Sequence, residues 1–184
     1  GRRVRLCHAH RRSVILISVP FRVIDFRGIE RLLRIGDIGD GDIAYKLSRM
    51  LDSLDEEGCL PKTILFALNP TANYVLGSML GNFQSSEAAS KIQLGSAWWF
   101  NDNIDGMREQ LKTFANLGVL GKFVGMVTDS RSFLSYPRHE YFRRILCGLI
   151  GDWVEQGLYP NDKSLIDIIR DISYNNASEY FGLK

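Results

Sequence analysis

The chain has 184 residues, of which 45% are hydrophobic, which is enough to bury one core of ordinary size. No stretch approaches the ~18 consecutive apolar residues that a membrane-spanning helix needs. The three cysteines are odd in number and far apart in the sequence, which favours reduced thiols in the cytoplasm over a disulfide framework.

The net charge of +2 is unevenly distributed along the chain. Residues 1–35 contain nine arginines, no lysine, and only Asp25 and Glu30 as acids. Such an arm could contact nucleic acid or a membrane surface. The plainer alternative is that this segment is not native sequence, and we expect it to be poorly ordered.

Helix and strand patterns alternate along the remainder. Hydrophobic residues recur at helical spacing in three segments, 42–54, 73–80 and 107–115. Three short apolar runs are predicted strands, 63–68, 91–94 and 123–127. The alternation favours parallel βα units covered by helices.

Two long amphipathic helices are predicted at the end of the sequence. The first runs from about Pro137 to near Gly157, and the second runs from beyond Pro160 to Gly182. Parallel strands of this kind form open doubly wound sheets or closed barrels. No glycine-rich GxGxxG or GxxxxGK[ST] motif follows these strands, so a nucleotide-binding sheet loses its best support.

A carboxylate and a guanidinium follow the last predicted strand, as Asp129 and Arg131. Residues just past the carboxyl ends of parallel strands are where α/β enzymes keep their chemistry. Strand-end Asp and Arg also serve as caps and ion-pair partners, so this pair alone does not assign a site.

Longer motifs make the sequence specific. They are Asn69-Pro70, Gly81-Asn82-Phe83-Gln84, Trp98-Trp99-Phe100-Asn101-Asp102 and the run TDSRSFLSYPRHEYFRR from Thr128 to Arg144. Together they resemble the C-terminal part of the uronate isomerase (glucuronate isomerase) family, over about residues 36–184. The resemblance implies the α/β fold of the amidohydrolase superfamily. The chain would be the C-terminal part, about strands 6–8 and their helices, of a (β/α)₈ TIM barrel.

The same resemblance implies an activity. The family interconverts D-glucuronate with D-fructuronate, and D-galacturonate with D-tagaturonate, as an aldose–ketose isomerisation in cytoplasmic uronate catabolism. A proton moves between C2 and C1, which requires a base and stabilisation of oxyanion charge. The implied cofactor is a divalent metal, with zinc as the first candidate. The implied partner is a small hexuronate rather than a nucleic acid or a membrane, and a homo-oligomer is open.

The resemblance also implies roles for individual residues. Asp129 matches a metal ligand and proton-transfer base, although a capping carboxylate is the alternative. Arg131 matches a substrate-gripping arginine, whose planar fork suits a carboxylate or vicinal oxygens, and an ion pair to Asp129 or to a neighbouring loop is its alternative. Trp98 or Trp99 matches a tryptophan of the sugar pocket, where an indole packs on the sugar and donates through its N–H. Core packing is equally open for either tryptophan.

Other polar residues receive structural interpretations. We expect His139 to be a helix-face histidine bonded to a neighbour, and Arg143 and Arg144 to be solvated or paired with loop carboxylates. Asp102 and Asp105 are expected to open the helix that follows them, by capping and by complementing its dipole.

Some expected parts of the family's site are not recognisable. The paired metal-binding histidines of its first strand, an upstream arginine and a histidine in an LHIGA-like motif have no match. Cys7-His8-Ala9-His10 contains an HxH, but it stands where the fifth strand is expected. Its codons, read one base later, can spell Met-His-Ile-Gly, so we interpret residues 1–35 as an out-of-frame stretch joined to residues 36–184.

Two alternatives to an active isomerase therefore stay open. The chain alone could be an incomplete, catalytically inactive fragment, because too few groups remain to hold metal and substrate. It could also derive from a metal-dependent hydrolase of the same superfamily, since fold and metal site are shared while the chemistry varies.

Overall fold

The structure is a computed structural model, and it describes residues 14–19, 22–25, 29–31, 43–128 and 130–183. The side chains that it describes are those of residues 43–98, 100–128 and 130–183. Within these residues no helix has the length and apolar character needed to cross a membrane.

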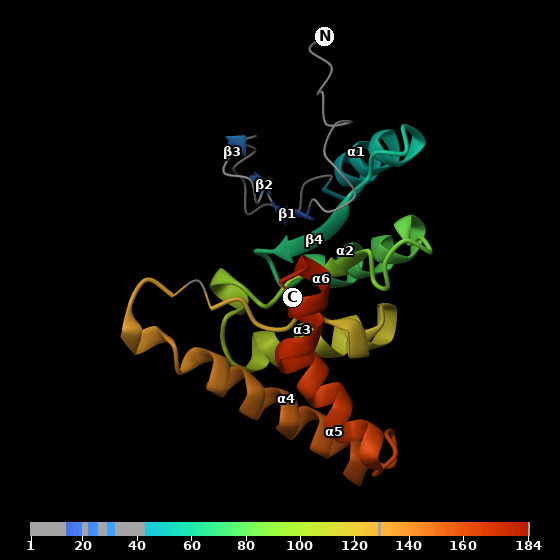
Figure 1. Cartoon of the computed structure of the whole chain (residues 1–184). Coiled ribbons are helices and arrows are strands. Elements are labelled where there is room, and N and C mark those ends of the chain that lie inside the picture. The colour runs from blue at the N-terminus through green and yellow to red at the C-terminus, as the bar shows by residue number, and fades with distance from the viewer. Residues whose placement is uncertain (1–13, 20–21, 26–28, 32–42, 129, 184) are drawn as a thin grey trace.

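A five-stranded sheet with the order β3-β2-β1-β4-β5 forms one layer of the fold (Figure 1). Its strands are β1 (Val14–Val19), β2 (Arg22–Asp25), β3 (Ile29–Arg31), β4 (Lys62–Ala67) and β5 (Ile92–Leu94). β1, β4 and β5 run parallel, with Leu65 opposite Leu94, whereas β2 and β3 are antiparallel additions. The carboxyl ends of the three parallel strands therefore meet at one edge.

The strands predicted at 63–68 and 91–94 are confirmed as β4 and β5. Every residue of β4 after Lys62 is buried, as are all three of β5. Parallel strands covered on both faces read as continuous apolar runs, which is why these short segments were recognisable.

The strand predicted at 123–127 is wrong. Residues 123–126 are buried and Val127 is exposed, and the segment pairs with no strand of the described sheet. Gly125 has a φ of +83°, which breaks an extended conformation, and a Cβ there would meet the carbonyl oxygen of Ile172. Side chains replace the ladder: Val124 N–H donates to Gln93 Oε1 at 3.0 Å, and Val127 N–H donates to Ser96 Oγ at 3.3 Å.

Four predicted helices are confirmed. They are α1 (Ile43–Glu56), α2 (Ala72–Leu80), α3 (Ile104–Leu117) and α4 (Arg138–Glu155). Short 3₁₀ turns lie between them, at η1 (Gly81–Phe83), η2 (Trp99–Asn101), η3 (Leu120–Lys122) and η4 (Phe133–Ser135). α2 packs on β4 and β5, α3 packs on α2, and α4 packs on the outer side of α3 (Figure 1).

The last predicted helix is divided into three consecutive parts. α5 (Lys163–Arg170) continues into a π-helical turn, η5 (Asp171–Asn175), and then into α6 (Asn176–Phe181). Gly182 ends it with a left-handed φ of +66°, as expected for a C-terminal glycine. The buried amide of Asn176 donates to the carbonyl oxygens of Gly121 and Phe123, both at 2.9 Å. α6 thus holds the segment 123–127, which is not paired with a strand of the described sheet.

Aromatic rings join this segment to the helices. Phe123 meets Phe114 of α3 at a centroid distance of 5.4 Å and Phe142 of α4 at 6.3 Å, both edge to face. The segment therefore sits in the core that α3 and α4 share, although it lies outside the sheet.

Tyr180 of α6 closes the opposite end of the strands. Its hydroxyl donates to the carbonyl oxygen of Lys91 at 2.8 Å, and Lys62 Nζ donates to the Tyr180 carbonyl oxygen at 2.7 Å. Burial raises the pKa of the Tyr180 hydroxyl, so it remains a neutral donor.

Part of the arginine-rich N-terminal segment lies in the sheet. β1 pairs with β4 from Val14↔Lys62 to Val19↔Ala67, and β2 and β3 follow it. The HxH of Cys7 to His10 lies outside the described residues. The interpretation of residues 1–35 as out-of-frame sequence stays a prediction.

Candidate functional site

The candidate site is the edge of the sheet where β4 and β5 end. β4 ends at Ala67, and Asn69 turns the chain by accepting a hydrogen bond from the backbone N–H of Thr71 at 3.0 Å. β5 ends at Leu94, followed by the buried residues Gly95 to Ala97 and then by Trp98. Both motif-bearing connections therefore leave from the same edge.

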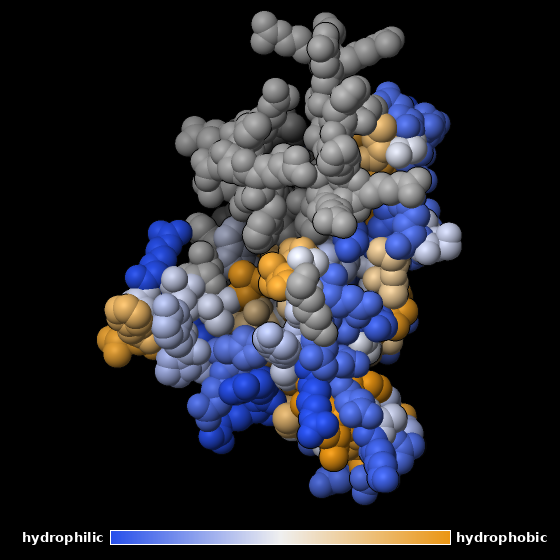
Figure 2. Space-filling view, in the orientation of Figure 1, coloured by the Kyte–Doolittle hydropathy of each residue, from blue (hydrophilic) through white to orange (hydrophobic). Residues whose placement is uncertain are grey.

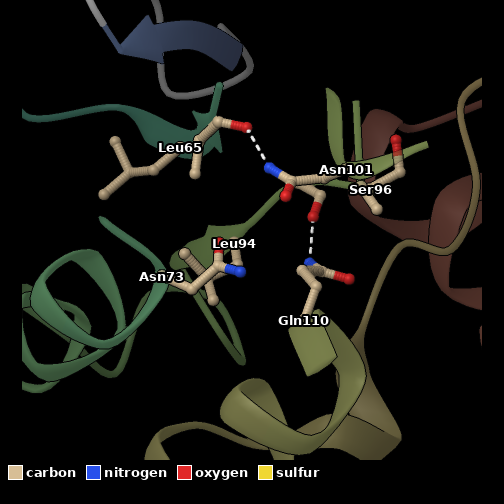
Figure 3. Close-up of a pocket in the computed structure, with 9 residues that line it drawn as sticks. Leu65, Asn73, Leu94, Ser96, Asn101 and Gln110 are labelled. Carbon is tan, nitrogen blue, oxygen red and sulfur yellow. Dashed lines mark hydrogen bonds between the residues drawn. The ribbon is translucent and has the colours of Figure 1, made fainter. Parts of the chain in front are cut away.

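A buried polar cluster lies under these two connections (Figure 3). Asn73 comes from α2, Asn101 from η2 and Gln110 from α3, and all three are buried. Asn101 Nδ2 donates to the carbonyl oxygen of Ala67 at 3.0 Å, and Gln110 Nε2 donates to that of Gly95. The cluster fastens the connection after β5 to the end of β4.

The cluster is packed so closely that no space remains inside it even for a water molecule. Ligand pockets usually measure ~300–1,000 Å³, so the cluster cannot hold a substrate. Asn73 Nδ2 and Asn101 Oδ1 face no hydrogen-bond partner among the described residues. We assign this cluster to support of the site rather than to binding.

Trp98 is half-buried at the start of the connection. Its ring meets the ring of Phe66 edge to face, at a centroid distance of 6.0 Å and an angle of 68°. Gly95 leaves room for this packing, because a Cβ there would collide with the Phe66 ring. The Trp98 ring therefore has a core contact, while the side chain of Trp99 lies outside the described residues. Which of the two faces a sugar stays a prediction.

The connection ends at Asp102, whose predicted capping role is wrong. Asn103 caps α3 instead, since its side-chain oxygen accepts from the backbone N–H of Gly106 at 2.9 Å. Asp102 forms an ion pair with Arg138, the first residue of α4. Asp105 does lie in the first turn of α3, where a carboxylate complements the dipole as expected.

The loop of residues 128–137 carries the second motif. Ser130 Oγ donates to Thr128 Oγ1 at 2.8 Å, and Arg131 is exposed. Asp129, the predicted base and metal ligand, lies outside the described residues. Phe133 and Leu134 are 84% and 90% exposed, and they form an apolar tip that projects from the molecule (Figure 2).

His139 and Arg144 belong to the face of α4. The His139 ring meets the Phe142 ring edge to face at a centroid distance of 6.2 Å. The pKa of His139 is lowered mainly by burial and also by the positive charge of Arg143. Arg144 donates to Glu140 at 2.6 and 3.0 Å, so its partner is on its own helix rather than on a loop. These contacts give neither residue a catalytic role.

The described residues do not provide a metal centre by themselves. None of their His, Cys, Asp and Glu side chains forms a group of three or more that is placed to hold an ion. A divalent metal at this edge would need ligands beyond the described residues.

Sequence reasoning missed the pair of Asp102 and Arg138 and the cluster of Asn101 and Gln110. A signal existed for the first, because an arginine at the first position of a helix opposes the helix dipole and calls for a carboxylate. The partner's position, however, follows only from the fold.

The chain matches the family model described as glucuronate isomerase over residues 34–181. The uronate isomerase of Caldanaerobacter subterraneus subsp. tengcongensis is 69% identical over 147 residues, which are 79% of this chain and 32% of that protein. The uronate isomerase of Halalkalibacterium halodurans is 59% identical over 148 residues, 80% of this chain and 31% of that protein. The chain thus spans about a third of the length of the curated relatives that it matches.

Solved structures give the same result. The crystal structure of the uronate isomerase from Thermotoga maritima superposes with a TM-score of 0.68 and 34% identity, over 79% of this chain and 31% of that one. Glucuronate isomerase from Caulobacter crescentus superposes with a TM-score of 0.60 over 87% of this chain and 31% of that one. At 24% identity, this second likeness concerns the fold alone.

Proposed function

The chain belongs to the glucuronate isomerase family, and from this premise we propose that it carries the C-terminal strands and two substrate loops of a uronate isomerase. In this proposal β4, β5 and the segment 123–127 occupy the positions of the sixth, seventh and eighth strands of a (β/α)₈ barrel. Their connections would then contribute to one site at the carboxyl ends of the strands.

The proposed reaction is the interconversion of D-glucuronate with D-fructuronate, and of D-galacturonate with D-tagaturonate. A base removes the C2 proton and a proton is delivered to C1, while donors stabilise charge on the oxygens. The observation that carries the proposal is the shared edge. The connection with Trp98 and the loop with Arg131 start beside each other and are joined by the ion pair of Asp102 with Arg138.

Each proposed role fits the chemistry of its side chain. Arg131 is the proposed partner of the substrate carboxylate, because a guanidinium offers two parallel donors. An indole of Trp98 or Trp99 is proposed to pack on the sugar. Asp129 is the proposed base.

A divalent metal, with zinc as the first candidate, is proposed for the complete protein only. Asp129 is its one proposed ligand from this chain, and the described residues add no ligand group to it. When bound, such an ion would polarise the substrate's oxygens. The cytoplasm is the proposed location, which fits the free thiols of Cys59 and Cys147.

A chimera tests the proposal. Residues 36–184 of this chain would replace the corresponding part of the Caldanaerobacter enzyme, to which it is 69% identical over 147 residues. The chimera is expected to isomerise D-glucuronate and to leave a panel of esters and amides untouched. Hydrolysis of the panel without isomerisation would instead assign the chain to a hydrolase.

Single substitutions in the chimera test the residues. Asp129→Asn and Arg131→Lys are expected to lower kcat/KM by a hundredfold or more, which corresponds to ~2.7 kcal/mol of transition-state stabilisation. Asp167→Asn and Arg170→Lys are the matched controls, because both residues lie exposed on α5, and they are expected to leave it unchanged. Full activity of Asp129→Asn would remove that residue from the mechanism.

A further inference from the structure

An ion pair links the two connections that carry the family motifs. Arg138 Nη2 contacts Asp102 Oδ2, with side chains that are 39% and 16% exposed. Asp102 follows η2, and Arg138 begins α4 immediately after the loop of residues 128–137. The pair therefore bridges the ends of two loops that are distant in sequence.

Local helix chemistry does not account for Arg138, and it does not require Asp102 as a cap. Asn103, not Asp102, caps α3. A positive charge at the N-terminus of α4 opposes the helix dipole, so Arg138 has no local reason to be there. The nearest acid on α4, Glu140, is hydrogen-bonded to Arg144. The carboxylate that compensates Arg138 is therefore the one on the other connection.

The Asp102 side of the pair is fixed to the sheet. The preceding residue, Asn101, is 1% exposed and donates to the last residue of β4, Ala67, at 3.0 Å. On the other side, the backbone of Asn101 lies so close to Gly106 that a Cβ on the glycine would stand 2.7 Å from Asn101 Cα. A carboxylate mounted on so constrained a backbone gives α4 a fixed point of attachment.

We propose that Asp102 and Arg138 form a positioning pair, which holds the loop of residues 128–137 in register with the connection that carries Trp98. Neither residue is catalytic in this proposal. Its relevance to isomerisation rests on the proposed function, since Arg131 and Trp98 are the groups whose spacing it would set. The spacing itself is a property of this chain and is measurable without substrate.

Backbone amide exchange in the 184-residue chain tests the pair. Three amides report on the loop and the start of α4: Tyr136, which donates to Phe133, His139, which donates to Tyr136, and Tyr141, which donates to Pro137. The amide of Gln156, which donates to Asp152 at the far end of α4, is the internal reference. Asp102→Asn and Arg138→Gln are each expected to speed exchange of the three amides about tenfold and to leave the reference unchanged.

The chain supplies a matched control in the ion pair of Arg108 with Asp152. This pair joins α3 to a part of α4 that is distant from the loop in sequence; its arginine is exposed to a similar extent, 33%, and its carboxylate is more exposed, 45%. Arg108→Gln is expected to leave the three amides within twofold of the parent. Combining Asp102→Asn with Arg138→Gln is expected to add nothing to either alone, and exchanging the two charges is expected to recover much of the protection.

Three results would overturn the proposal. The first is that Arg108→Gln speeds exchange of the three amides as much as Asp102→Asn or Arg138→Gln does. The second is additive effects in the double variant. The third is an increase that extends equally to the Gln156 amide, which would show general destabilisation.

Should Asp102→Asn not fold, Arg138→Lys, which keeps the charge and loses the planar fork, is expected to speed exchange of the three amides by a smaller factor. Parent-like exchange in it would overturn the proposal too. Because amide exchange is measured without substrate, it tests the positioning pair even if the isomerase assignment is refuted.

Discussion

Removal of the Asn176 amide tests how the segment before the Thr128 loop is held. Asn176 Nδ2 donates to the carbonyl oxygens of Gly121 and Phe123, both at 2.9 Å, and the residue is 5% exposed. The segment has no ladder partner in the described sheet, so these bonds replace part of what a neighbouring strand would give. Asn176→Ala deletes both N–H donors and leaves the buried carbonyl oxygen of Phe123 and the part-buried one of Gly121 without this partner.

The size of the effect follows from the two bonds. A typical hydrogen bond contributes ~0.5–1.5 kcal/mol, and leaving a buried partner unsatisfied raises the cost to ~1–3 kcal/mol. For two bonds with overlapping relaxation we expect a loss of about 2–4 kcal/mol in the free energy of unfolding. In a domain of this size, that corresponds to a fall in Tm of roughly 4–16 °C.

The neighbouring residue provides the control for this experiment. Asn175 is also an asparagine whose amide makes a 2.9 Å hydrogen bond, but to Asp171 on the exposed face. Asn175→Ala should therefore change stability by no more than ~0.5 kcal/mol. Denaturation in urea, followed by circular dichroism, compares the two variants. Equal effects of the two substitutions would refute the role assigned to Asn176.

Three further substitutions examine other contacts. Tyr180→Phe removes the hydroxyl that donates to the Lys91 carbonyl oxygen at 2.8 Å, so we expect a loss of ~1–2 kcal/mol in urea unfolding, and parent-like stability would refute that bond's contribution. Gly125→Ala forces a Cβ onto a φ of +83° and against a carbonyl, so its thermal midpoint should fall by several degrees, whereas an unchanged midpoint would contradict the positive φ. Hydrogen bonding from Arg144 lowers the pKa of Glu140 below its ordinary 4.5, so this pairing stabilises the chain above that pH and is lost as the pH falls through the lowered pKa. Arg144→Ala should return the Glu140 pKa towards 4.5 in an NMR titration, and an unmoved titration would exclude Arg144 as the cause.

Periodicity predicted most of the elements, because each helix and paired strand shows its own spacing. α4 is an example: its apolar residues recur at helical spacing from Tyr141 to Trp153, and the helix forms over Arg138–Glu155. The strand prediction for residues 123–127 was wrong because an apolar run has the same sequence pattern whether or not it pairs with a neighbouring strand. The glycine at its centre was the one local signal against a strand. The buried polar side chains of Gln93 and Ser96, which accept hydrogen bonds from the backbone of the segment, lie on another part of the chain.

The candidate site was predictable only as motifs. Trp98 and Arg131 were recognisable from their surrounding residues, but the packing of Trp98 on Phe66 depends on β4, a strand that ends at Ala67, far earlier in the sequence. The pairing of Asp102 with Arg138 likewise depends on how α3 and α4 cross. Contacts between distant segments are set by the tertiary fold, and the sequence spacing does not contain them.

Conversion of D-glucuronate by the chimera is the most direct test of the central claim. Its initial rate, followed by NMR as D-fructuronate appears, is compared with that of the Caldanaerobacter enzyme from which the remainder comes. We predict a rate within about tenfold of the parent enzyme, with loss of turnover on Asp129→Asn. A folded chimera that binds but does not isomerise D-glucuronate would contradict the proposal that this chain carries the loops of a uronate isomerase site.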